Sequence, residues 1–161
     1  MKKIIKRKKH RLNENNYKGN VRLTVTICSD QRKIIFNKNE IIINVVNFLK
    51  EEIKKENIIN YIYVFMPNHI HFIIEGTVHS NILEAIRLFK QRSSFYLKKE
   101  TGYGLQESFY DYIHRKEDDL TTHVRYVLNN PVRKNIVTDF KDYKYLGSID
   151  YNIDDILNTG G

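Results

Sequence analysis

Two apolar runs joined by a Pro-Asn pair constrain the fold of this chain more than any other feature. The runs span residues 58–66 and 69–75, and both are dominated by residues that favour strands, such as Ile, Val, Phe and Tyr. Pro67-Asn68 between them is a turn signal. Because so short a connection can join only antiparallel neighbours, we expect the two runs to form a β-hairpin.

The flanking sequence supplies further strands and two helices. Residues 22–27 and 108–115 have the composition of strands. Apolar residues at helical spacing begin after Asn39, which we expect to be an N-cap. They begin again after Asn81, which forms a capping-box pair with Glu84.

A third helix is expected to begin at residues 118–119. We expect it to end at Pro131, because a proline excludes the residue before it from the helical region. The order is then β-α-β-β-α-β, followed by this helix. Such an order is typical of a ferredoxin-like sandwich in the α+β class, with helices on one face of an antiparallel sheet. The other face would be free to carry a site.

The length of 161 residues predicts one domain. We expect a basic arm over residues 1–15, one domain over residues 16–147, and a polar, loosely held tail over residues 148–161. The single cysteine, Cys28, excludes an internal disulfide and is expected to be a buried, inert thiol. The chain has no apolar run long enough to span a membrane and no signal-peptide core, so we expect a cytoplasmic protein.

The net charge of +8 is concentrated at the start of the chain. Seven of the 27 basic residues and no acidic residue fall within residues 1–11, which leaves 20 basic and 19 acidic residues in the remainder. A basic arm of this kind often contacts nucleic acid. A solvated terminus that binds nothing explains the charge equally well. The candidate DNA-binding residues are Lys6, Arg7, Lys8, Lys9 and Arg11.

A His-x-His pair lies on the second strand of the expected hairpin. Side chains alternate across a strand, so His69 and His71 point to one face, roughly 7 Å apart. Ile70 and Phe72 point to the other face, where the helices are expected. Two neutral imidazoles on one face can bind a divalent metal, although a lone His-x-His is more often a coincidence of surface composition.

The third helix adds a tyrosine and an amide. At about 100° per residue, Tyr126 and Asn130 lie about 40° apart on a polar stripe that also holds His123. A solvated polar face is the ordinary explanation of such a stripe. The chemical explanation is a nucleophile beside a metal: a tyrosine hydroxyl is weak at its usual pKa of about 10 and gains from a metal that polarises the phosphate it attacks.

Two segments carry a family resemblance. Residues 66–74 (MPNHIHFII) resemble the His-hydrophobic-His strand of single-tyrosine HUH transposases. Residues 126–132 (YVLNNPV) resemble the Tyr-x-x-x-Asn-Pro-Val segment of their REP-associated tyrosine transposase branch, within the IS200-like superfamily. Residues 108–111 with Arg115 resemble the segment before that helix, and the resemblance extends from about residue 11 to residue 147.

The resemblance implies roles for matching residues. His69, His71 and Asn130 are the implied metal ligands, and Tyr126, with the two histidines, is the implied catalytic group. Mg²⁺ or Mn²⁺ would suit this chemistry, although the histidines alone would also accept Zn²⁺ or Ni²⁺. The implied reaction is cleavage of single-stranded DNA beside a hairpin, through a 5′-phosphotyrosine intermediate, and rejoining of strands. Relatives include dimers that exchange the tyrosine helix, but the branch implies a monomer. His123, one turn before Tyr126, is a candidate proton acceptor.

Two departures and two alternatives accompany this interpretation. Asn135-Ile136 stands where relatives often have Gly-Leu, which puts the local turn in question, and residues 22–24 lack the aromatic residues common in relatives.

One alternative function is a domesticated hairpin-DNA-binding protein without relevant cleavage. The other is a metal-dependent hydrolase that uses water. Tyr61 and Tyr110 are candidates to stack on unpaired bases.

Overall fold

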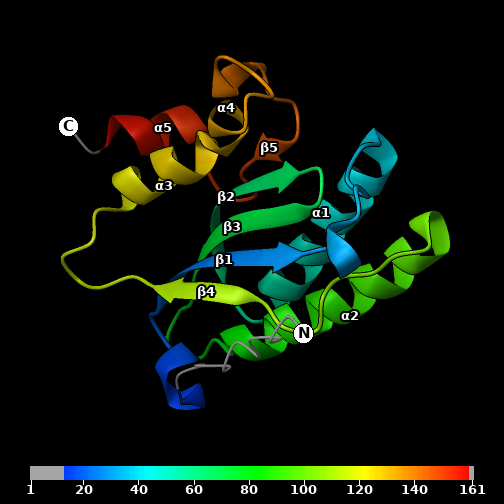
Figure 1. Ribbon diagram of the computed structural model, residues 1–161. Coiled ribbons are helices and arrows are strands. Elements are labelled where there is room, and N and C mark those ends of the chain that lie inside the picture. Colours follow the sequence, from blue (N-terminus) through cyan, green and yellow to red (C-terminus); the bar gives the residue numbers. More distant parts are fainter. Residues whose placement is uncertain (1–12, 160–161) are drawn as a thin grey trace, which may run out of the picture.

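The computed structural model describes residues 13–159 as a five-stranded antiparallel sheet with helices on both faces (Figure 1). The strand order is β4-β1-β3-β2-β5. The strands are β1 (Arg22–Cys28), β2 (Ile59–Met66), β3 (His69–Glu75), β4 (Tyr110–Ile113) and β5 (Leu146–Gly147). The first four strands have the order of a ferredoxin-like sandwich, which confirms the expected fold.

The expected hairpin lies at the centre of the sheet. β2 and β3 pair antiparallel on either side of the Pro67-Asn68 turn, with Met66 opposite His69. β3 also pairs with β1, so that Thr26 lies opposite His71 and Cys28 opposite His69. β3 is therefore hydrogen-bonded on both edges, which fixes its register and the face to which each side chain points.

The main core lies between the sheet and helices α1 (Asn39–Lys55) and α2 (Ile82–Thr101). Ile70, Phe72 and Ile74 of β3 are fully buried there, as the alternation predicted. The side chain of Asn81 accepts a hydrogen bond from the Glu84 backbone amide, which confirms the N-cap of α2.

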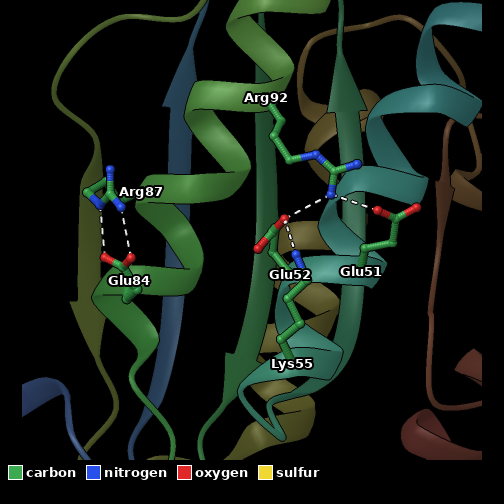
Figure 2. A network of polar contacts seen from close by, with 6 residues as sticks. All are labelled: Glu51, Glu52, Lys55, Glu84, Arg87 and Arg92. Atoms are coloured by element: carbon green, nitrogen blue, oxygen red, sulfur yellow. Dashed lines mark hydrogen bonds and ion pairs between the residues drawn. The ribbon is translucent and has the colours of Figure 1, made fainter.

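Charged side chains link α1 to α2 at the edge of this core (Figure 2). Arg92 of α2 contacts Glu51 at 2.7 Å and Glu52 at 2.8 Å, and Lys55 contacts Glu52 at 3.0 Å. Glu52 is buried, so these partners supply the charge that its carboxylate needs away from water. Arg87 pairs with Glu84 on α2 itself.

The second face of the sheet carries α3 (Leu120–Leu128), α4 (Asn130–Arg133) and α5 (Ile153–Asn158). A smaller core there joins Ile62 and Val64 of β2 and Ile73 of β3 to Val124 of α3 and Ile156 of α5. We expected helices on one face, the other face free for a site, and a further helix that carries the tyrosine. α3 is that helix, and it covers the face over β2 because its own apolar stripe must be buried.

Three further details differ from the sequence prediction. Lys38, not Asn39, occupies the N-cap position of α1 and makes no side-chain cap. Pro131 does not end a helix but lies in the first turn of α4, where a missing N–H costs nothing. Short 3₁₀ turns cover the ranges Glu14–Tyr17, Asp30–Arg32 and Phe140–Asp142.

The C-terminal segment is packed onto the domain, whereas we expected it to be loosely held. The side chain of Asp150 accepts a hydrogen bond from the Asn60 backbone amide, and Thr121 of α3 donates one to the carbonyl of Ile156. Ile156 is only 5% exposed. The tail therefore contributes to the position of α3.

Candidate active site

A cleft opens between the end of α3 and strands β1, β3 and β4. Its two adjoining parts, of about 520 and 420 Å³, share four lining residues, so they form one continuous groove. The shared residues are Thr26, His71, Tyr126 and Asn130. His69 lines the larger part. The sequence-predicted catalytic and metal-binding residues thus lie at one site, brought from β3, α3 and α4.

The two histidines are held through their Nδ1 atoms. His69 Nδ1 donates a hydrogen bond to Asn68 Oδ1 at 2.7 Å, and His71 Nδ1 lies 2.7 Å from Thr26 Oγ1. The rings meet edge to face, with centroids 4.7 Å apart. Because the Asn68 oxygen only accepts, His69 Nδ1 carries the proton and Nε2 keeps a free lone pair; His71 Nε2 keeps one when the Thr26 hydroxyl accepts from Nδ1.

Burial keeps both histidines neutral. It lowers the pKa of His69 to about 4, helped by the charges of Arg32 and Lys134. It lowers the pKa of His71 to about 3, helped by His69 and Arg133. At neutral pH the pair therefore has the charge state that metal ligation requires.

Tyr126 stands on the open side of the cleft. Its side chain is 66% exposed, and its hydroxyl makes no hydrogen bond with any residue of the described range 13–159. The Arg133 guanidinium lies 3.8 Å from the centre of its ring and donates a hydrogen bond to the Tyr126 backbone carbonyl. The phenol is thus held by its ring face, and its oxygen is available to a substrate.

Asn130 has the opposite environment. It is only 7% exposed, yet within residues 13–159 its side-chain amide has no hydrogen-bond partner. Its amide oxygen and nitrogen are not among the fully buried unpaired atoms of the described residues, so the amide opens onto the cleft, where a group from outside the protein can bond to it. The residue follows a break at Asn129 between α3 and α4, so it does not continue the stripe of Tyr126 on one helix as we predicted.

Sequence reasoning missed the basic side chains of the cleft. Arg32, Arg133 and Lys134 line the same part as His69. Arg32 has a left-handed backbone conformation with φ of 53°, which is uncommon for a residue with a Cβ atom. Arg133 and Lys134 directly follow the Asn-Pro-Val motif, and that adjacency was the signal available in the sequence.

The other end of the cleft is lined by rings and hydroxyls. Tyr112 of β4 stacks on His123 of α3, with centroids 5.5 Å apart and planes inclined by 23°. The Tyr112 hydroxyl donates to Asp118 at 2.8 Å. His114 lies behind His123, with ring centroids 4.1 Å apart, and its Nε2 is 2.7 Å from Thr24 Oγ1.

The remaining sequence candidates lie in different places. Lys6, Arg7, Lys8, Lys9 and Arg11 fall outside the described residues. Tyr110 lines the basic part of the cleft. Tyr61 stacks on Tyr151 and donates to Glu75, so its ring and hydroxyl already have partners within the protein. Cys28 is buried, as expected.

Asn135 accounts for one departure from the resemblance. It has a φ of 58°, in the left-handed region that glycine adopts most easily. Asparagine tolerates this region better than most residues, so the turn forms without the glycine.

The described part of the chain lacks two features. Over residues 13–159 no group of three His, Cys, Asp or Glu side chains is gathered as for a metal ion. Within the same range no helix has the length and apolar character to cross a membrane.

The family model described as "Transposase IS200 like" matches residues 17–117. The match covers more than half of the chain, and the protein therefore belongs to the family of IS200-like transposases. The matched segment contains β1 to β4 with His69 and His71. It ends before α3, so the assignment of Tyr126 and Asn130 rests on the cleft itself.

Two solved structures share the fold. A REP-associated tyrosine transposase bound to a REP hairpin is 16% identical, with a TM-score of 0.69 over 84% of this chain and 81% of that one. A protein from Deinococcus radiodurans described as a transposase is 11% identical, with a TM-score of 0.52 over 77% of this chain and 97% of that one. No protein of curated function matches the chain.

Proposed function

We propose that the protein is a metal-dependent transposase that cuts and rejoins single-stranded DNA beside a hairpin. Membership of the IS200-like family supports the general activity. The observation that carries the specific proposal is the convergence of His71, Tyr126 and Asn130 on one cleft, with His69 beside them. All four belong to one chain, which favours a monomer acting with its own tyrosine.

The donor set fits a divalent metal. The Nε2 atoms of His69 and His71 and the unpaired amide oxygen of Asn130 are the ligands that the cleft offers. Mg²⁺ and Mn²⁺ accept such a mixed set when phosphate and water fill the remaining positions. A cation bound there polarises the scissile phosphate and offsets the charge that develops on its oxygens.

The remaining residues of the cleft have separable roles. The hydroxyl oxygen of Tyr126 attacks the phosphorus, a new bond to the DNA 5′ phosphate forms, and the bond to the 3′ oxygen breaks. The phenol loses its proton, and the departing 3′ oxygen gains one. Arg32 and Lys134 offer positive charge to the strand at the His69 end of the cleft. The bond energy is conserved in the phosphotyrosine, so a second 3′-hydroxyl can reverse the step.

The hairpin substrate is proposed from the relative of known structure, which is bound to a REP hairpin. Recognition of a hairpin by this chain fits its net charge of +8. We assign the contacts to the basic arm, Lys6, Arg7, Lys8, Lys9 and Arg11.

A covalent-trapping assay tests the proposal. The protein is incubated with Mn²⁺ and an oligonucleotide that carries an inverted-repeat hairpin from beside the coding region, and is then run on a denaturing gel. We expect a protein–DNA adduct with the wild type and none with Tyr126→Phe or in excess chelator. Tyr126→Phe is a matched control because the ring under Arg133 is retained.

The alternatives give different results. Cleavage without an adduct, retained in Tyr126→Phe, identifies a hydrolase that uses water. Tight hairpin binding with neither cleavage nor adduct identifies a binding protein. Either result contradicts the proposal.

A further inference from the structure

The two ends of the cleft differ sharply in charge. The end near His69 is lined by Arg32, Arg133 and Lys134. The other end is lined by Thr24, Tyr112, Thr122, His123 and Val127, and no Lys, Arg, Asp or Glu of the described chain lines it. We call these the basic half and the aromatic half. Tyr126 lines both halves, at the boundary between them.

This division matches the chemistry of a nucleotide. A phosphodiester is anionic and belongs among guanidinium and ammonium groups, whereas a base is flat, neutral and mostly apolar. A strand whose scissile phosphate lies at Tyr126 has a base within one nucleotide of that point. The aromatic half is the uncharged space that adjoins Tyr126 in the same groove.

We propose that the aromatic half is a subsite for one unstacked nucleobase that flanks the phosphate attacked by Tyr126. The inference rests on the proposed strand-cleavage function, because the position of the base is defined by the scissile phosphate. The aromatic half, at about 420 Å³, is within the size range of small-molecule sites.

The walls of the subsite are suited to a flat ligand. The Tyr112 ring is 43% exposed on edge strand β4, and its hydroxyl is tied to Asp118 at 2.8 Å, which fixes the plane of the ring. His123 stacks against it and lines the same pocket. The hydroxyls of Thr24 and Thr122 can accept further hydrogen bonds from the edge of a base.

The subsite has a structural consequence for catalysis. A base seated between β4 and α3 contacts the helix that carries Tyr126, so binding of the strand and placement of the nucleophile are linked. The subsite also gives the enzyme a means to prefer one base beside the cut, through Thr24 and Thr122 rather than through the hairpin.

Abasic substitution tests this inference. The hairpin oligonucleotide carries single-stranded arms, and each arm nucleotide is replaced in turn by an abasic residue. Affinity is measured by fluorescence anisotropy in chelator, so that no cleavage occurs. We expect one arm position at which loss of the base weakens binding to the wild type by about tenfold, the usual effect of losing one base–aromatic stack.

Three variants assign that effect to the aromatic half. Tyr112→Phe keeps the ring and should keep the abasic effect. Tyr112→Ala should bind intact and abasic DNA with equal affinity. Thr122→Trp fills the pocket from an exposed helix position and should also abolish the abasic effect. This variant replaces Tyr112→Ala in the test if Tyr112→Ala is too unstable to measure.

The trapping assay run on the same DNA separates the two proposals. An adduct together with no position-specific abasic effect, or with one unchanged in Tyr112→Ala and Thr122→Trp, overturns the subsite and leaves the cleavage chemistry intact. A position-specific effect that both variants abolish, without any adduct, supports a base subsite and overturns the chemistry.

Discussion

His69 and His71 owe their suitability as ligands to residues that the sequence does not place beside them. Thr26 is 45 positions before His71 in the chain, yet the β1–β3 register sets the two directly opposite each other. The hydrogen bond between them decides which ring nitrogen is left for a metal. A strand pattern predicts that the two histidines share a face, but it does not predict this partner.

Thr26→Val removes the hydroxyl at nearly constant shape. Because the His71 ring then loses its hydrogen-bond partner, we expect affinity for Mn²⁺ to fall by about 10- to 100-fold, as at other sites that lose such a partner. Isothermal titration with Mn²⁺ measures the change. Thr24→Val is the matched control, since Thr24 lies on the same strand face and contacts His114 instead. If Thr26→Val and Thr24→Val lose Mn²⁺ affinity equally, the hydrogen bond from Thr26 to His71 does not support metal binding.

His114 gives a prediction about pH. Burial lowers its pKa to about 4, below the ordinary 6.5, so the folded protein resists protonation. The contribution of His114 to the free energy of unfolding is therefore complete above pH 6.5 and is lost as the pH falls from about 6.5 to about 4. The charged groups around it are His123 and Arg22, which lower its pKa further, and Asp118 and Glu75, which raise it.

Urea unfolding at pH 7 and pH 5 measures this contribution. His114→Gln should lose less stability than the wild type over that interval. His69 and His71 titrate in the same sense in both proteins, so the difference between the two proteins isolates His114. Parallel pH profiles would show that the burial of His114 does not govern its titration.

At the scale of elements, most of the sheet and α3 were predictable, whereas α4 and α5 were not. β3 was predicted to the residue because strand alternation and the Pro67-Asn68 turn agree. The break at Asn129 was not, because a proline is compatible both with the end of one helix and with the first turn of the next. The consequence is chemical, since the break places Asn130 in a buried position while Tyr126 stays exposed.

The packing of the second face depends on α5, and a substitution in this helix can test it. Ile156 is buried against α3, and its truncation to alanine leaves a cavity under the helix that carries Tyr126. We expect Ile156→Ala to lower the free energy of unfolding by about 2 kcal/mol, the lower end of the usual range because the helix is short. Asp155→Ala, at an exposed position of the same helix, should change it by less than about 0.5 kcal/mol. Equal effects in urea unfolding would mean that α5 is not anchored through Ile156.

At the scale of the whole molecule, the element order predicted the fold but not α4 and α5. Four strands and two helices suffice to define a ferredoxin-like sheet from sequence. α5 begins with a capping Asn152 and an acidic first turn, but its six residues are too few for an apolar period to predict a buried helix. The basic half of the cleft was missed because its charged side chains come from two distant segments, Arg32 and Arg133-Lys134, and only the fold brings them together.

Charge is also a property of the whole chain. Residues 1–11 hold seven basic residues and no acidic one. Deleting them should weaken hairpin binding and flatten the dependence of log K on log salt, by roughly 0.7–0.9 for each phosphate that the arm no longer neutralises. Fluorescence anisotropy over a series of salt concentrations measures the slope. An unchanged slope would show that the arm binds no phosphate.

The central claim is that Tyr126 is the nucleophile of a metal-assisted cleft. The most direct test is to digest the trapped protein–DNA adduct with protease and nuclease and to locate the attached nucleotide by mass spectrometry. We predict a single nucleotide joined through its 5′ phosphate to the peptide that contains Tyr126. Attachment to any other residue, such as Tyr110 or Tyr112 in the same cleft, would contradict the account.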